Sequence, residues 1–109
     1  MDTTTHDRIR QQVTDNPVVL FMKGVPDQPQ CGFSAKVVGM LDKLTTGYAT
    51  VNILQDPAVR EGMKELSSWP TFPQLYVNGD LVGGCDIAIE MYKSGELKQL
   101  LADAGAVPA

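Results

Sequence analysis

Hydrophobic residues follow the chain in short runs and helical stripes, separated by polar segments that contain glycine or proline. The run Val18–Met22 is entirely apolar, which is typical of a strand buried on both faces of a parallel sheet. Further along, apolar residues recur at helical spacing and predict a helix over Gly32–Leu44. Residues 23–30 lie between these elements, contain one glycine and two prolines, and are predicted to form a loop.

The segments on either side of these elements predict further helices and a second strand. Residues 5–14 are polar with a narrow apolar stripe, which predicts a short helix. Residues 48–53 predict a strand, although the alternation of apolar and polar positions is imperfect. Asp56 can cap the free amides of a third helix, and Pro57 suits its first position.

The last third of the chain predicts a hairpin and two helices. Asn78-Gly79 separates two short apolar runs and supplies the positive φ angles of a tight turn. Helical spacing returns over residues 87–92 and 97–101, and the final residues are expected to fray. The order α-β-α-β-α-β-β-α-α predicts an α/β fold, a single domain over residues 1–109 with a four-stranded mixed sheet flanked by helices.

Composition and charge narrow the function classes. The net charge of −4 argues against a general binder of nucleic acid or anionic membranes. No run approaches the roughly 18 apolar residues of a membrane span, and the N-terminal stretch lacks the apolar core of a secretory signal. The single histidine, His6, is predicted to face solvent. The two cysteines form no disulfide framework or zinc site and indicate reduced thiols in the cytoplasm.

Cys31 is the first candidate for chemistry. It follows a predicted buried strand and a loop and begins a helix, where free amides and the helix dipole stabilise a thiolate. Lys23 would add positive potential if the loop folds back, whereas the structural alternative is a buried, inert cysteine. Ser34 occupies the position of the second cysteine in a C-x-x-C pair. Oxidised Cys31 must therefore pair with an external thiol, with Cys85 or with a metal.

Three other places are candidates for ligand binding. A cis peptide bond between Phe72 and Pro73 would expose backbone groups to an extended peptide, and the alternative is an ordinary turn. Residues 83–86 end a strand and begin a helix, so their amides can meet a carboxylate or simply form a turn and cap. Asp86 either caps that helix or accepts a bond from an ammonium group. Arg60 suits a carboxylate or, equally, a solvated helix face.

Separated motifs in this order resemble those of the monothiol glutaredoxins. They are Lys23-Gly24, Pro29, Cys31-Gly32-Phe33-Ser34, residues 69–76, and Gly83-Gly84-Cys85-Asp86-Ile87. The resemblance spans residues 17–101 and implies the glutaredoxin form of the thioredoxin fold. One departure is Val25, which stands where a threonine is common in relatives.

The resemblance implies a glutathione site. Lys23 and Arg60 would meet the glycine carboxylate, and Thr71 would pair its backbone with the cysteine of glutathione beside a cis proline. Cys85 and Asp86 would hold the γ-glutamyl end. The complete set of expected glutathione-binding residues is Lys23, Arg60, Thr71, Phe72, Pro73, Gly84, Cys85 and Asp86.

The resemblance also implies a function. In the family, two protomers share one [2Fe-2S] cluster held by two protein cysteines and two glutathione thiols, which makes Cys31 the expected metal ligand. The expected role is transfer of this cluster by a cluster-bridged homodimer, with apo iron–sulfur proteins and a BolA-like protein as partners and at most weak oxidoreductase activity. The alternatives are an enzyme that removes glutathione from mixed disulfides through Cys31, and an adapter whose cysteine is silent.

Overall fold

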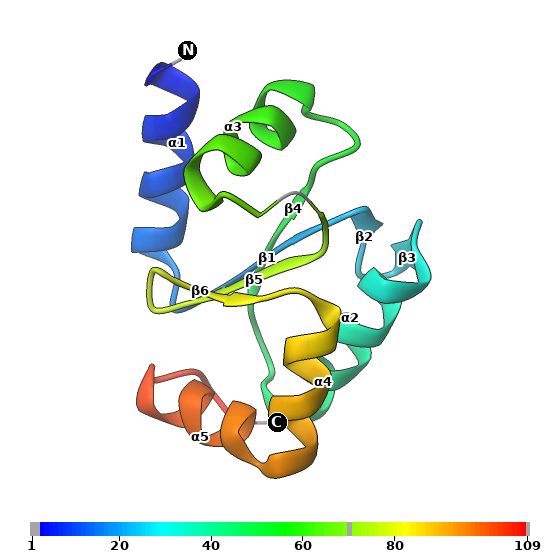
Figure 1. The fold of residues 1–109 in the computed structure, drawn as a ribbon. Helices are drawn as coiled ribbons and strands as arrows, with labels where there is room; N and C mark the ends of the chain where they lie inside the picture. Colours follow the sequence, from blue (N-terminus) through cyan, green and yellow to red (C-terminus); the bar gives the residue numbers. More distant parts are fainter. Residues whose placement is uncertain (1–2, 70, 109) are drawn as a thin grey trace.

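A four-stranded mixed sheet forms the centre of the computed structural model, which describes residues 3–69 and 71–108 (Figure 1). The strands lie in the order β4 (Ala49–Asn52), β1 (Val18–Met22), β5 (Gln74–Val77) and β6 (Asp80–Gly83). β1 pairs in parallel with β4 and antiparallel with β5, and β6 forms a hairpin with β5. The predicted fold class, a mixed four-stranded sheet flanked by helices, is confirmed.

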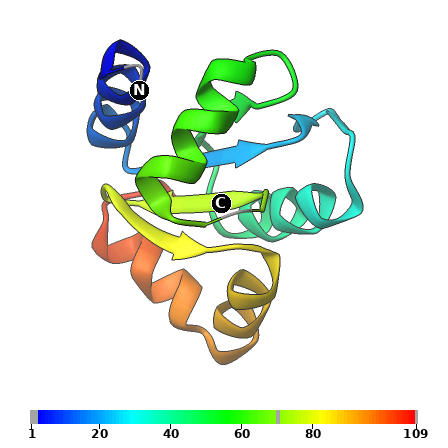
Figure 2. The same ribbon diagram turned by 45° about the horizontal axis from the view of Figure 1, so that its top comes forward.

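In the part of the chain that the structure describes, five helices cover the two faces of the sheet (Figure 2). On one face lie α1 (Thr3–Asp15) and α3 (Pro57–Ser67), and on the other lie α2 (Gly32–Leu44), α4 (Cys85–Ser94) and α5 (Glu96–Asp103). None of the helices within the described residues is long and apolar enough to span a membrane.

The central strand β1 supplies side chains to two separate cores. Val18, Leu20 and Met22 pack against α2, α4 and α5, whereas Val19 and Phe21 face α1 and α3. All five side chains are buried, because both faces of the strand are covered. The uninterrupted apolar run therefore identifies the strand that anchors the whole sheet.

Two predicted local signals are confirmed in detail. Asp56 accepts a hydrogen bond of 3.2 Å from the Val59 amide at the start of α3, where Pro57 occupies the first turn. Asn78 and Gly79 have φ angles of 53° and 83° in the turn between β5 and β6.

The expectation of a plain loop over residues 23–30 is wrong. This segment contains a miniature hairpin, β2 (Gly24–Val25) and β3 (Gln28–Pro29), closed by a 2.8 Å hydrogen bond from the Gln30 amide to the Lys23 carbonyl. Gly24 makes this possible with a φ of 94°, a conformation that side chains with a Cβ rarely adopt. Prolines are tolerated here because the two strands are short and lie at an edge.

The expectation that the final residues fray is also wrong. The Thr45 hydroxyl donates a 2.6 Å hydrogen bond to the Val107 carbonyl, and the Thr46 amide donates to the same oxygen over 3.0 Å. Thr45 and Pro108 form an isolated β-bridge. The tail up to residue 108 therefore packs back on the junction between α2 and β4.

His6 does not face solvent as predicted. Its side chain is buried between α1 and α3, and Nε2 lies 3.0 Å from Glu65 Oε2. Gly62 allows this close packing, because an added Cβ would lie only 3.1 Å from Ile9 Cδ1. The partner carboxylate is 59 residues away in the chain, so local sequence could not reveal it. Residues 1, 2, 70 and 109, which the single-domain and motif predictions include, lie outside the described residues.

Candidate functional site

A cavity of about 380 Å³ opens where the β2–β3 hairpin, the loop before β5 and the beginnings of α2 and α4 meet. It contains eight of the nine predicted site residues. These are Lys23, Cys31, Thr71, Phe72, Pro73, Gly84, Cys85 and Asp86. Three further lining residues, Phe33, Trp69 and Ile87, belong to the motifs but were not predicted as site residues. Their apolar character gave no chemical reason to select them.

Cys31 stands at the N-cap of α2 and is partly exposed. Its sulfur makes no N-cap hydrogen bond of standard geometry, yet the Ser34 backbone amide approaches closely enough to lower the pKa of Cys31. Partial burial opposes this shift, while the Phe33 amide and the Lys23 charge reinforce it. The net direction is downward, so Cys31 is the more nucleophilic thiol of the two.

Ser34 links the helix that carries Cys31 to the hairpin that carries Lys23. It is fully buried, and its Oγ accepts a 3.2 Å hydrogen bond from the Lys23 amide. Asn52 makes a second link, because its Oδ1 accepts from the Gly24 amide over 3.0 Å. Ser34 is therefore a structural hydrogen-bond acceptor where a dithiol protein would carry a second thiol.

Cys85 lines the same cavity but has the opposite acid–base character. Burial raises its pKa, the Lys36 charge lowers it, and the charges of Asp86 and Cys31 raise it further. The two cysteines are free thiols. At neutral pH Cys85 is therefore a buried thiol beside the more reactive Cys31.

The first turn of α4 forms another wall. Its N-cap is Gly84, and no side chain caps the helix, so the suggestion that Asp86 caps it is wrong. Asp86 is exposed in the first turn of α4. The backbone amides of this turn have no side-chain cap and point out of the N-terminal end of the helix. This arrangement suits a ligand that carries both a carboxylate and an ammonium group.

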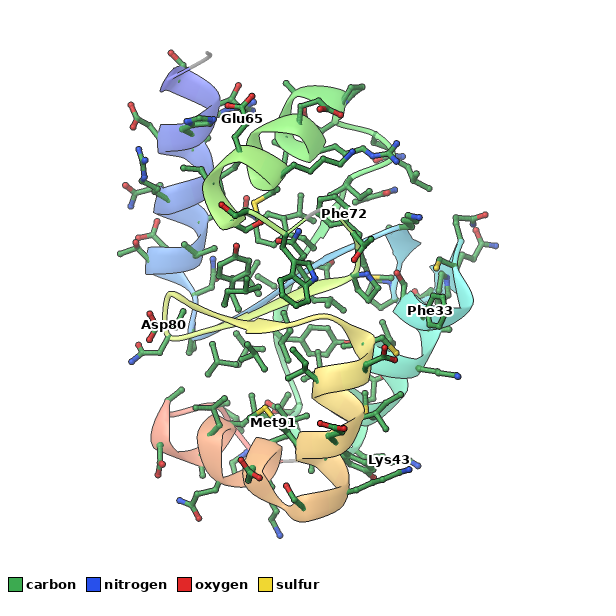
Figure 3. All side chains as sticks on the ribbon, in the orientation of Figure 1. Phe33, Lys43, Glu65, Phe72, Asp80 and Met91 are labelled. Atoms are coloured by element: carbon green, nitrogen blue, oxygen red, sulfur yellow. The ribbon has the colours of Figure 1, made fainter. Side chains whose placement is uncertain are left out.

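The loop before β5 forms a further wall, next to the start of α4. The Phe72–Pro73 peptide bond is cis, as the hypothesis of a ligand-binding loop at this position required. Figure 3 labels Phe72 on this loop and Phe33 at the start of α2. Phe33 is 55% exposed, and Lys36 Nζ lies 5.8 Å from the centre of its ring.

Arg60 is the one predicted site residue that the structure does not bring to the cavity. It lies in the first turns of α3, and its Nε is buried without a hydrogen-bond partner among the described residues. Within the described residues, no group of three or more His, Cys, Asp or Glu side chains could hold a metal ion. The cavity thus combines one nucleophilic thiol with backbone groups suited to a short peptide.

Comparison with known proteins gives consistent matches. The family profile described as Glutaredoxin matches residues 18–82. Glutaredoxin 4 of Escherichia coli strain K12 is 50% identical over 104 residues, covering 95% of this chain and 90% of that protein. Monothiol glutaredoxin-S17 of Arabidopsis thaliana is 53% identical over 98 residues, which cover 90% of this chain but only 20% of that protein. A crystal structure of a buckwheat glutaredoxin–glutathione complex superposes with a TM-score of 0.86 at 27% identity, covering 96% of this chain and 94% of that one.

Proposed function

Because the chain belongs to the glutaredoxin family and has monothiol glutaredoxins among its relatives, we propose that it binds glutathione in the cavity beside Cys31. The observation that carries the proposal is the meeting of a thiol of lowered pKa, a cis-proline loop and an uncapped helix start in one cavity. Glutathione is a tripeptide with a central thiol and a carboxylate at each end. The cavity volume of about 380 Å³ lies in the range of small-molecule sites.

Each part of glutathione has a proposed partner. Lys23 would attract the glycine carboxylate, and Arg60 would have to turn its guanidinium toward the same group. The loop backbone at Thr71 would pair with the central cysteine. Cys85 and Asp86, at the start of α4, would receive the γ-glutamyl end through a backbone amide and a carboxylate.

We further propose that two such chains carry a [2Fe-2S] cluster as cargo. The cluster needs four thiolate ligands, and the described part of one chain offers a single thiol of lowered pKa, Cys31. Two copies of Cys31 and two glutathione thiols would complete the set in a cluster-bridged homodimer. A cluster held partly by exchangeable thiols can pass to apo iron–sulfur proteins, with a BolA-like protein as a further partner. Free thiols suit this role in the reducing cytoplasm.

Anaerobic reconstitution with iron, sulfide and glutathione tests the cluster proposal. We expect visible absorption of a [2Fe-2S] centre and a dimer mass only when glutathione is present. Cys31→Ser should abolish both signals, whereas the matched Cys85→Ser variant should keep them because Cys85 is a buried thiol of raised pKa. Cluster assembly in Cys31→Ser would refute the ligand assignment.

The lowered pKa of Cys31 favours a second candidate, removal of glutathione from mixed disulfides. The Cys31 thiolate would attack the glutathione sulfur, form a Cys31–glutathione disulfide and release the other thiolate. A second glutathione thiolate would attack the glutathione sulfur of that disulfide, releasing glutathione disulfide and regenerating Cys31. Turnover of a small glutathione mixed disulfide at the rate of an active dithiol glutaredoxin would favour this function over cluster transfer.

A further inference from the structure

Gln74 is a fully buried polar side chain directly beneath the loop that lines the cavity. Its Nε2 donates two hydrogen bonds, to the Trp69 carbonyl over 2.9 Å and to the Thr71 carbonyl over 3.1 Å. Its Oε1 is buried and has no hydrogen-bond partner among the described residues. An unpaired buried oxygen is costly, so an apolar side chain would serve β5 better if packing were the only role of this position.

The bond to Thr71 determines the direction of a backbone donor. The Thr71 carbonyl and the Phe72 N–H belong to one peptide group, and the cis bond is the following one, Phe72–Pro73. In a planar trans peptide the carbonyl and the N–H point in opposite directions. Because Gln74 draws the carbonyl into the interior, the Phe72 N–H points away from the interior, toward the cavity that Thr71 and Phe72 line.

The same amide also holds Trp69, at the other end of the loop, beside the start of α4. Trp69, whose carbonyl is the second acceptor, lies close to Gly84 at the start of α4. A Cβ on Gly84 would be 3.4 Å from both Trp69 Nε1 and the Pro73 carbonyl oxygen. One buried amide therefore binds two residues that line the cavity, and one of them, Trp69, lies against Gly84 at the start of α4.

We propose that Gln74 is a positioning residue, which fixes the Thr71–Phe72 peptide so that its N–H is presented to a peptide ligand in the cavity. The proposal builds on the proposed binding of glutathione, whose central residue offers a backbone carbonyl to such a donor. Gln74 itself touches no ligand. It acts by holding the Thr71–Phe72 peptide group in the orientation that leaves the Phe72 N–H free to donate to a ligand.

Gln74→Leu tests the proposal, since it keeps the approximate size but removes both donors. The matched control is Val77→Ala, which also creates a defect in buried β5 but lies at the far end of the strand. The first measurement is the orientation of the Phe72 N–H in ligand-free protein, from NMR residual dipolar couplings. We expect a changed coupling in Gln74→Leu and an unchanged one in Val77→Ala. Unchanged couplings in Gln74→Leu would overturn the proposal, whether or not glutathione binds.

The second measurement is the dissociation constant of S-methylglutathione, which cannot form a disulfide with Cys31. Gln74→Leu should weaken binding about tenfold, the loss expected for one well-aimed hydrogen bond, while Val77→Ala stays within about twofold of the unmodified protein. Equal weakening of S-methylglutathione binding in both variants would show that Gln74 only supports the fold, and would overturn the proposal. Failure of the unmodified protein to bind would instead refute the proposed function, and the couplings would still decide the role of Gln74.

Discussion

Replacing Gly24 by alanine should destabilise the protein and displace the segment that leads into Cys31. The added Cβ would lie 2.6 Å from the Gln28 carbonyl oxygen and 2.7 Å from the Gln30 amide nitrogen, so backbone must move. The φ of 94° costs alanine about 1–2 kcal/mol, and loss of the bond between Gln30 and Lys23 adds about 1 kcal/mol. We expect the free energy of unfolding to fall by about 2–3 kcal/mol, a loss after which a protein of ordinary stability is still folded.

Gly39→Ala is the matched control, with an effect of opposite sign. Gly39 lies within α2, and nothing would come within 4 Å of an added Cβ. Alanine there should stabilise the protein by about 0.5–1 kcal/mol. Urea unfolding followed by circular dichroism measures both changes, and iodoacetamide labelling then reports whether Cys31 of Gly24→Ala is still reactive in the folded state. A Gly24→Ala protein as stable as the unmodified one would refute the reasoning from the contact distances.

Four further predictions concern other parts of the molecule. Iodoacetamide followed by mass spectrometry should label Cys31 before Cys85 at neutral pH, because the fold lowers the first pKa and raises the second. The Cys31 thiolate accordingly stabilises the fold at alkaline pH, and this stabilisation is lost as the pH falls through the lowered pKa of Cys31. The protonated Cys85 thiol has the opposite effect, because its contribution to stability is lost as the pH rises through the raised pKa of Cys85. Asp56→Ala should cost about 1 kcal/mol in urea unfolding by removing the cap of α3, and an unchanged midpoint would contradict that role. Glu65→Ala should cost about 1 kcal/mol in the same assay by leaving His6 without its carboxylate, and no loss would show that water replaces the partner.

Most of the architecture could be predicted because its signals are local. The run Val18–Met22 is apolar at every position, and Asp56-Pro57 and Asn78-Gly79 each carry the chemistry of a specific cap or turn. The helix Gly32–Leu44 was predicted with the bounds that the structure shows. Such signals depend only on neighbours in the chain, and tertiary contacts leave the structures that they predict unchanged.

The errors involve contacts that join distant parts of the chain or depend on one backbone angle. His6 looked polar and exposed, but Glu65 lies 59 residues away and meets it between two helices. Val107 is held by Thr45, 62 residues earlier, which no pattern in the tail reveals. The miniature hairpin depends on the positive φ of Gly24, a conformation that glycine permits but does not demand.

The candidate site was partly predictable for a related reason. Cys31 could be selected because a thiol at the start of a helix has recognisable chemistry. Gln74 could not, since a glutamine in a strand carries no signal until its two acceptors are placed above it. Arg60 shows the reverse error, because a suitable charge does not establish that the side chain reaches the cavity.

The position of Trp69 has a practical consequence. It is the single tryptophan of the chain, and it lines the cavity that also contains Cys31 and Cys85. The tryptophan fluorescence of the protein therefore comes entirely from the candidate site. Occupation of the cavity, or a new bond to sulfur beside the indole, would change the intensity and wavelength of that emission. Ligand titrations and stopped-flow kinetics can thus be followed optically in the unlabelled protein.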